Sequence, residues 1–244
     1  MLRAIRFDPL PTGRQRQSGN EYAVWDLQKP PARQEISITA RIELIRADLA
    51  TARGRSPTPA GPATARWLQP ERFLESDHLT VQAAAEGLIG PDALATVRAI
   101  HDFVLETLEP APHDPADRGA LWSLHHRRGD CSEYSDLFVA LCRARRIPAF
   151  TCEGFVTTAV ADGDTARHQW AEAFIAGVGW TPFDPFHVAR GSAQFDELQP
   201  TRIRTSIRRN DPNLEGFHQY HFRYWGDPVE VTESFTAREW QEPR

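Results

Sequence analysis

Apolar residues recur at helical spacing between residues 131 and 144, and this repeat constrains the fold more than any other part of the sequence. Five of them occupy positions i, i+3, i+4, i+7 and i+8 and share one face of the predicted helix: Tyr134, Leu137, Phe138, Leu141 and Cys142. Cys131 lies three residues before Tyr134, which puts it on the first turn of that face. Asp130 precedes it and is suited to cap the helix. The pattern predicts a buried helix that begins with a cysteine.

The place of Cys131 at a helix N-terminus has a chemical consequence. Unpaired N–H groups and the positive end of the helix dipole favour a thiolate over a thiol at this position. The same N–H groups can hold the oxyanion of a tetrahedral intermediate. Cys142 and Cys152 fall among apolar residues of a helix and a strand, and we interpret both as inert core. A lone buried cysteine is usually core as well, so Cys131 needs partners before it predicts chemistry.

Two alternating segments downstream supply those partners. Alternation over residues 167–175 predicts a strand with His168, Trp170, Glu172 and Phe174 on one face. Asp184 is the last residue of a second predicted strand over residues 180–184. A hairpin centred on residue 176 would place Asp184 opposite His168, and one centred on residue 178 would move them two pairs apart. In both registers the carboxylate lies near the imidazole, and a helix packed over the sheet would bring Cys131 to His168. This arrangement predicts a thiol nucleophile, a base and an orienting carboxylate.

The remaining elements predict an α+β fold. We expect two or three strands over residues 21–49, a Pro- and Gly-rich linker over 52–63, helices over 80–88 and from Pro91 onward with Asp92 at the N-terminus, and a strand over 149–156. We also expect a turn at 162–164 and a hairpin of strands 217–225 and 229–235 closed by Gly-Asp-Pro. The chain then divides into an N-terminal β region with its linker (1–63), a core (64–200) and a C-terminal hairpin that completes the core sheet (201–244).

Composition excludes several classes of function. The formal net charge is −5 and the pI about 6.0, so no nucleic-acid partner is expected. We therefore interpret the basic stretch over residues 202–209 as a solvated loop or as a contact to an acidic surface. No run of about 18 apolar residues predicts a membrane span, and no apolar run near the N-terminus predicts a signal peptide, so we expect a cytoplasmic protein. The three cysteines are too few for a disulfide scaffold and fit a reducing compartment.

Metal or cofactor chemistry is not expected. The three cysteines lack the spacing of a thiolate zinc site. The histidine pairs at 125–126 and at 218 and 221 are not joined by further ligands, so surface or loop roles are the commoner explanation. We therefore predict no metal and no cofactor.

The three motifs occur in the order of a known family. The run GDCSEYSDLFVALCRA over residues 129–144, followed by Ile-Pro-Ala, resembles the cysteine motif of the transglutaminase-like superfamily. The segments HQWAE (168–172) and GWTPFDP (179–185) are similar to its histidine and aspartate motifs. The resemblance is nearest to microbial transglutaminase-like proteins, in which an N-terminal β region precedes a papain-like core. One departure is the pair Arg145 and Arg146, where the family usually has a glycine after the helix.

The resemblance implies a mechanism as well as a fold. It implies Cys131 as nucleophile, His168 as general base and acid, and Asp184 as orienter, acting on a peptide, isopeptide or glutamine amide through a thioester. Its microbial branch favours hydrolysis over crosslinking, as in a cysteine peptidase or amidase, and no calcium site is expected. Neither the acceptor nor a second oxyanion donor is fixed by a motif, and Trp122 is suggested by position alone.

Two alternatives remain at this stage. The run RGDCSE over residues 128–133 also resembles the cysteine motif of arylamine N-acetyltransferases, which use the same triad on acetyl-CoA, although the Trp-Ala-Glu context and the late position of the cysteine oppose it. A transglutaminase-like domain can also serve as a binding module without catalysis. Loss of a triad residue would mark that case, and all three residues are present.

Overall fold

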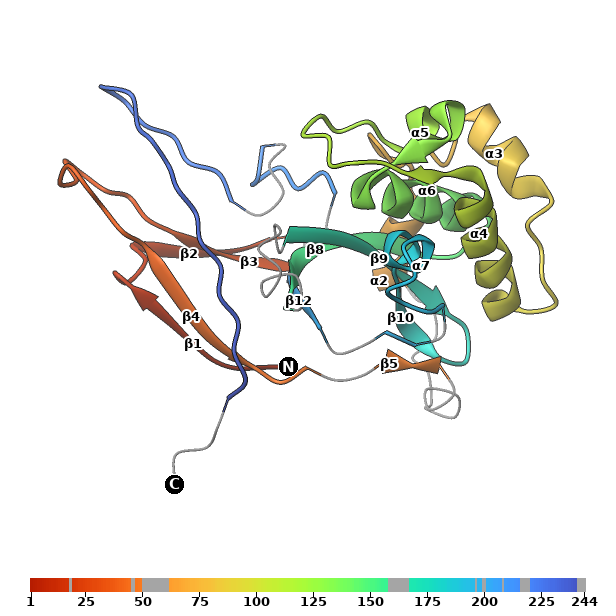
Figure 1. Cartoon of the computed structure of the whole chain (residues 1–244), viewed down its shortest axis with the longest axis horizontal. Helices are drawn as coiled ribbons and strands as arrows, with labels where there is room; N and C mark the ends of the chain where they lie inside the picture. The colour runs from red at the N-terminus through yellow and green to blue at the C-terminus, as the bar shows by residue number, and fades with distance from the viewer. Residues whose placement is uncertain are drawn as a thin grey trace.

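The computed structural model describes residues 1–17, 19–44, 47–49, 62–157, 167–195, 197–198, 201–207, 209–215 and 220–240. Figure 1 shows two regions: strands of the N-terminal segment on one side, and helices packed on a central sheet on the other. The expected turn at 162–164 and nearly all of the expected linker at 52–63 lie outside the described residues.

The central sheet is antiparallel and has four strands in the order β10-β9-β8-β12. Its strands are β8 (Ala149–Val156), β9 (Arg167–Ile175), β10 (Gly179–Phe183) and β12 (Arg202–Ser206). The first three match the strands predicted from alternation, because each carries β-branched or aromatic residues that are buried in the core.

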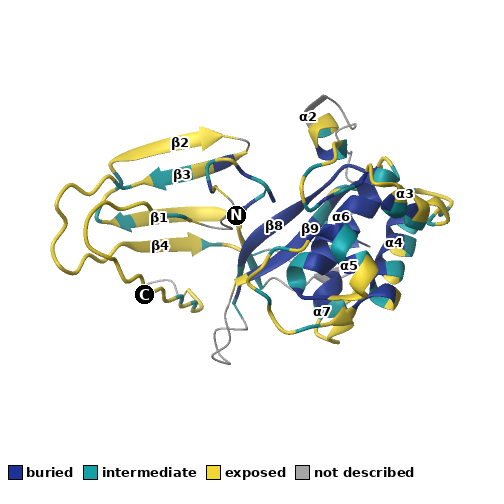
Figure 2. Cartoon of the chain, turned by 90° about the horizontal axis from the view of Figure 1, so that it is seen from above, coloured by how far each residue is buried: buried dark blue, intermediate teal, exposed yellow. Residues whose placement is uncertain are grey.

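Helix α6 (Cys131–Ala144) runs through the middle of this region. It packs against β9 and is surrounded by four further helices: α3 (Leu79–Glu86), α4 (Ala93–Thr107), α5 (Ala120–His126) and α7 (Pro185–Ala189). Every residue from 133 to 143 is buried, and Figure 2 shows the helix inside its neighbours. The expectation of a single buried face was therefore too narrow, because the polar residues of α6 are also covered and hold buried partners.

The cap predicted for α6 is present, whereas α4 begins at Ala93 and not at the predicted Pro91, so Asp92 is its N-cap. The Asp92 Oδ1 accepts the N–H of Ala95 at 2.8 Å and so caps α4. The Asp130 Oδ1 accepts the N–H of Ser132 at 2.9 Å, and the Asp130 N–H donates to Glu133 at 3.0 Å, which makes a capping box. After α6, Arg146 takes the left-handed conformation with φ 61°, which explains why a glycine is usual at this point.

The hairpin of β9 and β10 has a register between the two that the sequence allowed. Gly179 pairs with Ile175, and Phe183 pairs with Ala171, so the turn centres on residue 177. Asp184 follows the last pair and is the N-terminal cap of α7.

The N-terminal region consists of short strands. β1 (Leu2–Asp8) pairs with β4 (Ser37–Ile42), β2 (Gly13–Gln17) pairs with β3 (Asn20–Val24), and β5 (Ala47–Asp48) pairs with β11 (Glu197–Leu198). Of these, β1, β2 and β4 are exposed along nearly their whole length. The remaining short elements are α2 (Pro62–Ala65), the 3₁₀ helix η1 (Arg66–Leu68), β6 (Glu109–Pro110) and β7 (Arg128–Gly129). β3, β4 and β5 fall at or within the predicted stretch, whereas β1 and β2 were not predicted because nearly all their residues are exposed.

The C-terminal prediction needs a correction. Within residues 220–225 and 229–235 the structure has no strand, so the expected hairpin is wrong in its elements; the sheet is completed by β12 instead. The physical reason is that most of the large apolar side chains there stay exposed, Trp225 to 89% and Phe222 to 50%, although Phe235 stacks on Phe155 of β8. The division at residues 63 and 200 stays a prediction.

Among the described residues, no helix combines the length and the apolar character that a membrane span requires.

Candidate active site

The three predicted site residues lie at the ends of three neighbouring elements. Cys131 is the first residue of α6, His168 is the second residue of β9, and Asp184 caps α7. α6 contacts both β9 and α7, and in its first turn the ring of Tyr134 lies 5.5 Å from that of Phe186 in α7.

Gln169 joins the first turn of α6 to β9. Its side-chain amide donates to the Ser132 carbonyl at 3.3 Å and to Asp136 Oδ1 at 3.0 Å. The Ser135 hydroxyl donates to the Gln169 carbonyl at 3.2 Å and to the Cys131 carbonyl at 2.7 Å. A backbone hydrogen bond from Gln169 also reaches the Cys131 thiol, where it favours the thiolate. His168 directly precedes Gln169 in β9. These contacts therefore hold the first turn of α6, which carries Cys131, against the start of β9, which carries His168.

His168 and Asp184 form a buried hydrogen-bonded pair. His168 Nε2 lies 2.8 Å from Asp184 Oδ2, and the two side chains are 5% and 0% exposed. The other carboxylate oxygen, Oδ1, accepts the backbone N–H of His187 at 3.1 Å as the cap of α7. The carboxylate therefore orients the imidazole from a position that the helix start holds fixed.

Two further residues bind the same carboxylate and were not predicted. His187 Nδ1 lies 2.9 Å from Asp184 Oδ2, and its ring stacks on that of His168 with centroids 4.2 Å apart. Arg202 donates from Nε to the same oxygen at 2.8 Å and also through Nη2. A signal for both residues was present: His187 stands three residues after Asp184, and Arg202 is the first residue of the basic stretch.

The electrostatics keep Asp184 ionised. Its burial alone would raise its pKa, but the charges of His168 and Arg202 and the hydrogen bonds hold the pKa well below its usual range. Burial lowers the pKa of His168, and Asp184 opposes this only in part. The imidazole is therefore poised to be neutral and to accept a proton.

The thiol of Cys131 is also poised to be protonated. Burial and then the negative charge of Asp130 raise its pKa, and the backbone hydrogen bond from Gln169 opposes them. The residue is nonetheless partly exposed, whereas Cys142 and Cys152 are both fully buried. The N-terminal position thus does not by itself produce the thiolate that the sequence favoured, because burial, and then the Asp130 carboxylate that caps the helix, act against it.

The first turn of α6 leaves one backbone donor for an oxyanion. The Ser132 N–H is bound by the Asp130 cap. The Cys131 N–H is the first of the helix and has no acceptor inside it. Trp122 is partly exposed and stacks on His126 at 4.2 Å between ring centroids.

A metal ion does not suit this cluster. The ligand atoms of His168, Asp184 and His187 lie within 4.8 Å of one another, which resembles a metal-binding group. The guanidinium of Arg202, however, donates to Asp184 Oδ2 and lies 2.9 Å from His187 Nδ1. A divalent ion would have to displace this fixed cation.

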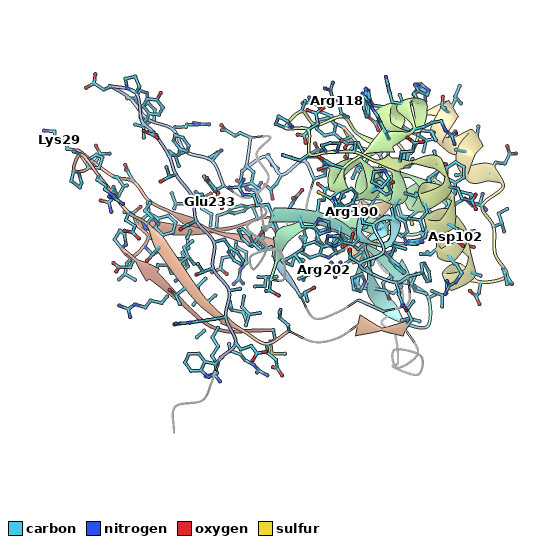
Figure 3. All side chains as sticks on the ribbon, viewed as in Figure 1. Lys29, Asp102, Arg118, Arg190, Arg202 and Glu233 are labelled. Carbon is cyan, nitrogen blue, oxygen red and sulfur yellow. The ribbon has the colours of Figure 1, made fainter. Side chains whose placement is uncertain are left out.

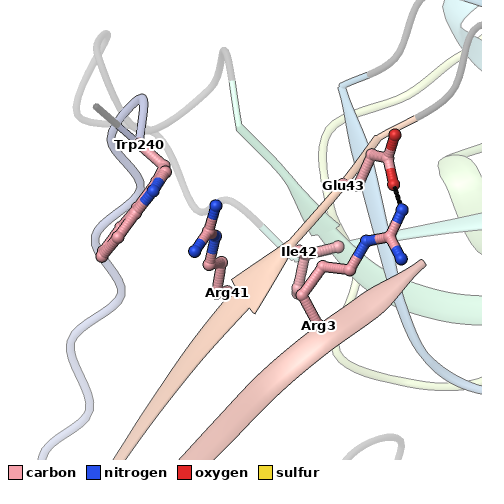
Figure 4. Close-up of a pocket in the computed structure, with 5 residues that line it drawn as sticks. All are labelled: Arg3, Arg41, Ile42, Glu43 and Trp240. Carbon is pink, nitrogen blue, oxygen red and sulfur yellow. Dashed lines mark hydrogen bonds and ion pairs between the residues drawn. The ribbon is translucent and has the colours of Figure 1, made fainter. Parts of the chain in front are cut away.

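A pocket of about 340 Å³ lies in the other region of the molecule, between the N-terminal strands and the C-terminal segment. Figure 4 shows its lining, in which Arg3 pairs with Glu43 and Arg41 faces the ring of Trp240 at 4.3 Å. None of the three predicted site residues lines it.

The comparisons with known proteins agree with this fold. The family profile of the Transglutaminase-like superfamily matches residues 82–185. A candidate cysteine protease from Cytophaga hutchinsonii is similar in structure, with a TM-score of 0.58 and 18% identity over 86% of this chain and 71% of that one. The periplasmic domain of TgpA from Pseudomonas aeruginosa reaches a TM-score of only 0.41, with 21% identity over 54% of this chain and 50% of that one. No curated protein matches the sequence.

Proposed function

We propose that this chain is a thiol enzyme that transfers the acyl group of an amide, because residues 82–185 match the profile of the Transglutaminase-like superfamily. Cys131 is the nucleophile, His168 the general base and acid, and Asp184 the orienting carboxylate. The observation that carries the proposal is the buried hydrogen bond between His168 Nε2 and Asp184 Oδ2. It leaves Nδ1 as the ring atom that exchanges a proton with the thiol.

The reaction begins from a neutral thiol and a neutral imidazole. His168 takes the proton of Cys131 as the sulfur attacks the amide carbonyl, and the oxyanion that forms is held by the Cys131 N–H. The imidazolium then gives its proton to the departing amine, the C–N bond breaks and a thioester remains on Cys131. Water or a second amine, deprotonated by His168, attacks the thioester and frees the thiol.

Asp184 contributes by holding the imidazole and stabilising its charged form. Because the carboxylate is fully buried and its pKa is held low, it stays ionised while His168 is protonated. Removal of the carboxylate would leave both ring nitrogens without a fixed orientation. Such a residue is worth several orders of magnitude in turnover where it has been tested in other triads, about 10⁴.

We propose a peptide or protein amide as the substrate and water as the usual acceptor. The support is the resemblance to microbial transglutaminase-like peptidases and the structural similarity to a candidate cysteine protease. The fold and the triad are common to hydrolases and crosslinking enzymes, so the acceptor has to be measured.

Trapping of the acyl-enzyme tests the proposal. The full chain is incubated with peptide and amide libraries, quenched in acid, and analysed by mass spectrometry beside Cys131→Ala and His168→Asn. We expect adducts that map to Cys131, are absent in Cys131→Ala and form far more slowly in His168→Asn. Adding an amine distinguishes the acceptors, because a crosslinking enzyme gives the amide of that amine and a hydrolase gives the free acid.

One observation favours a second function, a binding module without catalysis. Burial and the charge of Asp130 raise the pKa of the Cys131 thiol, which is opposite to the shift found in strongly nucleophilic cysteines. In that case no Cys131-dependent adduct would form with any library member, while peptides would still bind the folded chain.

A further inference from the structure

The basic stretch at residues 202–209 is bound to the acidic residues of all three motifs. Arg202 donates to Asp184 of the aspartate motif, and Arg204 donates to Glu172 of the histidine motif at 2.6 Å. Arg209 donates to Asp136 of the cysteine motif at 3.1 Å. The sequence offered either a solvated loop or a contact to an acidic surface, and these arginines make the second. Arg208 lies outside the described residues.

Arg202 is the one of these that reaches the candidate triad. It is the first residue of β12, where it pairs with Val156 of β8, and its side chain is only 9% exposed. Figure 3 labels it beside the core sheet. Nε and Nη2 donate to a single oxygen, Asp184 Oδ2, and Nη2 also lies 2.9 Å from His187 Nδ1. The residue stands 17 positions beyond the part of the chain that the family profile matches, which ends at residue 185.

We propose that Arg202 is a positioning residue for the His168–Asp184 pair, holding the carboxylate in place and limiting how strongly it attracts a proton to the imidazole. This inference rests on the proposed function only for its effect on turnover, because the contacts to Asp184 exist whatever Cys131 does.

The first part of this role follows from geometry. An arginine fork that donates two N–H groups to one carboxylate oxygen restricts the rotation of that carboxylate. Asp184 Oδ1 is already held by the start of α7. The two oxygens are thus fixed from two different elements, and the oxygen that accepts from His168 cannot swing away.

The second part follows from charge. The charged and titratable groups that act on His168 are Asp184 and His187 at the start of α7 and Arg202 from β12, while Glu153 lies on the neighbouring strand β8. The negative charge of Asp184 stabilises the imidazolium of His168 and raises its pKa. The positive charge of Arg202, bound to the same carboxylate oxygen, lowers that pKa. An ionised Asp184 without Arg202 would raise the proton affinity of His168. The triad would then hold its proton too tightly to return it to a leaving amine near neutral pH.

The experiment measures the titration of His168 by NMR in the full chain labelled at histidine, with His168→Asn identifying the signal. Arg202→Gln removes the charge and the fork, Arg202→Lys keeps the charge, and Arg204→Gln removes a charge from the same strand without touching Asp184. We expect Arg202→Gln to raise the midpoint by about one pH unit, or about tenfold in proton affinity. Arg202→Lys and Arg204→Gln should each stay within about 0.3 of the wild type.

The outcomes separate the inference from the proposed function. A His168 midpoint in Arg202→Gln that equals the wild-type value overturns the role of Arg202. If Arg202→Gln fails to fold, the rate at which iodoacetamide alkylates Cys131 in Arg202→Lys tests the inference instead. Because this variant has lost the fork, we expect Cys131 to react with iodoacetamide about tenfold more slowly than in the wild type at an unchanged midpoint, and an unchanged rate overturns positioning. The proposed function can also fail by itself. If His168→Asn leaves the rate of Cys131 alkylation unchanged while Arg202→Gln shifts the His168 midpoint, the proposed function is wrong and the role of Arg202 in positioning the His168–Asp184 pair stands.

Discussion

Replacement of Arg209 by methionine should destabilise the chain strongly, because its guanidinium is the main counter-charge for a buried carboxylate. The Arg209 Nε donates to both oxygens of Asp136, at 3.1 and 3.2 Å, and Nη2 donates to Asp117 at 2.7 Å. The Arg209 side chain is 1% exposed, and that of Asp136 is 0% exposed. The variant leaves Asp136 in the core with the Gln169 amide, 3.0 Å away, as a remaining partner.

The magnitude follows from the burial of the pair. Removal of one partner of a buried ion pair costs about 3–5 kcal/mol, because the other charge is left without compensation. For a domain of this size that corresponds to a fall in Tm of roughly 6–20 °C. The Arg209 guanidinium also lies over the ring of Phe73, 4.6 Å from its centroid, and methionine loses this cation–π contact as well.

The cost should also depend on pH with a definite sign. Burial raises the pKa of Asp136 to about 7, and Arg209 lowers it, so the variant lets that pKa rise further. A carboxyl whose pKa is higher in the folded than in the unfolded state loses stability as pH rises from its unfolded value through its folded value. Arg209→Met should therefore be more destabilised, relative to the wild type, at about pH 8 than at about pH 5.

Urea denaturation followed by tryptophan fluorescence gives the free energy of unfolding for Arg209→Met, Asp136→Asn and the double variant. The double variant should lose less than the sum of the single losses, because the two residues interact directly. Arg16→Met is the control: it breaks the exposed pair with Glu21 and should cause no measurable change. A loss below about 1 kcal/mol in Arg209→Met would refute the reasoning, since that is the cost of an exposed pair.

Two further predictions concern the sheet and the core. Gly154→Ala should lower the free energy of unfolding by about 1–3 kcal/mol, because a Cβ there would meet the Ile203 carbonyl oxygen at 1.9 Å and push β12 away from β8. The control is Gly13→Ala, which has open space around the added Cβ and should unfold at an unchanged urea midpoint. His101 is 1% exposed, and burial lowers its pKa, opposed in part by Asp102, whose Oδ1 lies 3.5 Å from His101 Nδ1. A histidine with a lowered folded pKa loses stability as pH falls below its unfolded value, so His101 should contribute a loss of up to about 1 kcal/mol between about pH 6.5 and 5.5, seen as the difference between the wild type and His101→Leu. His101→Leu should remove that loss in urea titrations at the two pH values, and an equal loss in the variant would contradict it.

The sequence predicted the elements whose signals are local. The apolar repeat and the Asp130 cap define α6, and alternation defines β8, β9 and β10, because each pattern is contained in a few neighbouring residues. The same locality explains why the β9–β10 hairpin could be limited to a narrow choice of register and why His168 and Asp184 were expected close together.

The missed features depend on contacts between distant residues. Arg202 meets Asp184 across 18 positions, and Arg209 meets Asp136 across 73, so no local pattern connects them. The N-terminal strands β1 and β2 are exposed on nearly every residue and show no buried face to detect. The C-terminal aromatic residues do alternate, but alternation predicts a strand only where a core exists for one face to cover.

The rate at which Cys131 reacts with iodoacetamide tests the central claim most directly, that Cys131, His168 and Asp184 work as one unit. Cys142 and Cys152 are fully buried, so their slow reaction would mean nothing, and the comparison has to be between variants at Cys131 itself. Mass spectrometry of the Cys131 peptide at about pH 7 gives the rate for the wild type, His168→Asn and Asp184→Asn. We predict that both substitutions slow the reaction at least about tenfold, because the thiol loses its base or the orientation of that base. Equal rates in the wild type and His168→Asn, with both proteins folded, would contradict the claim.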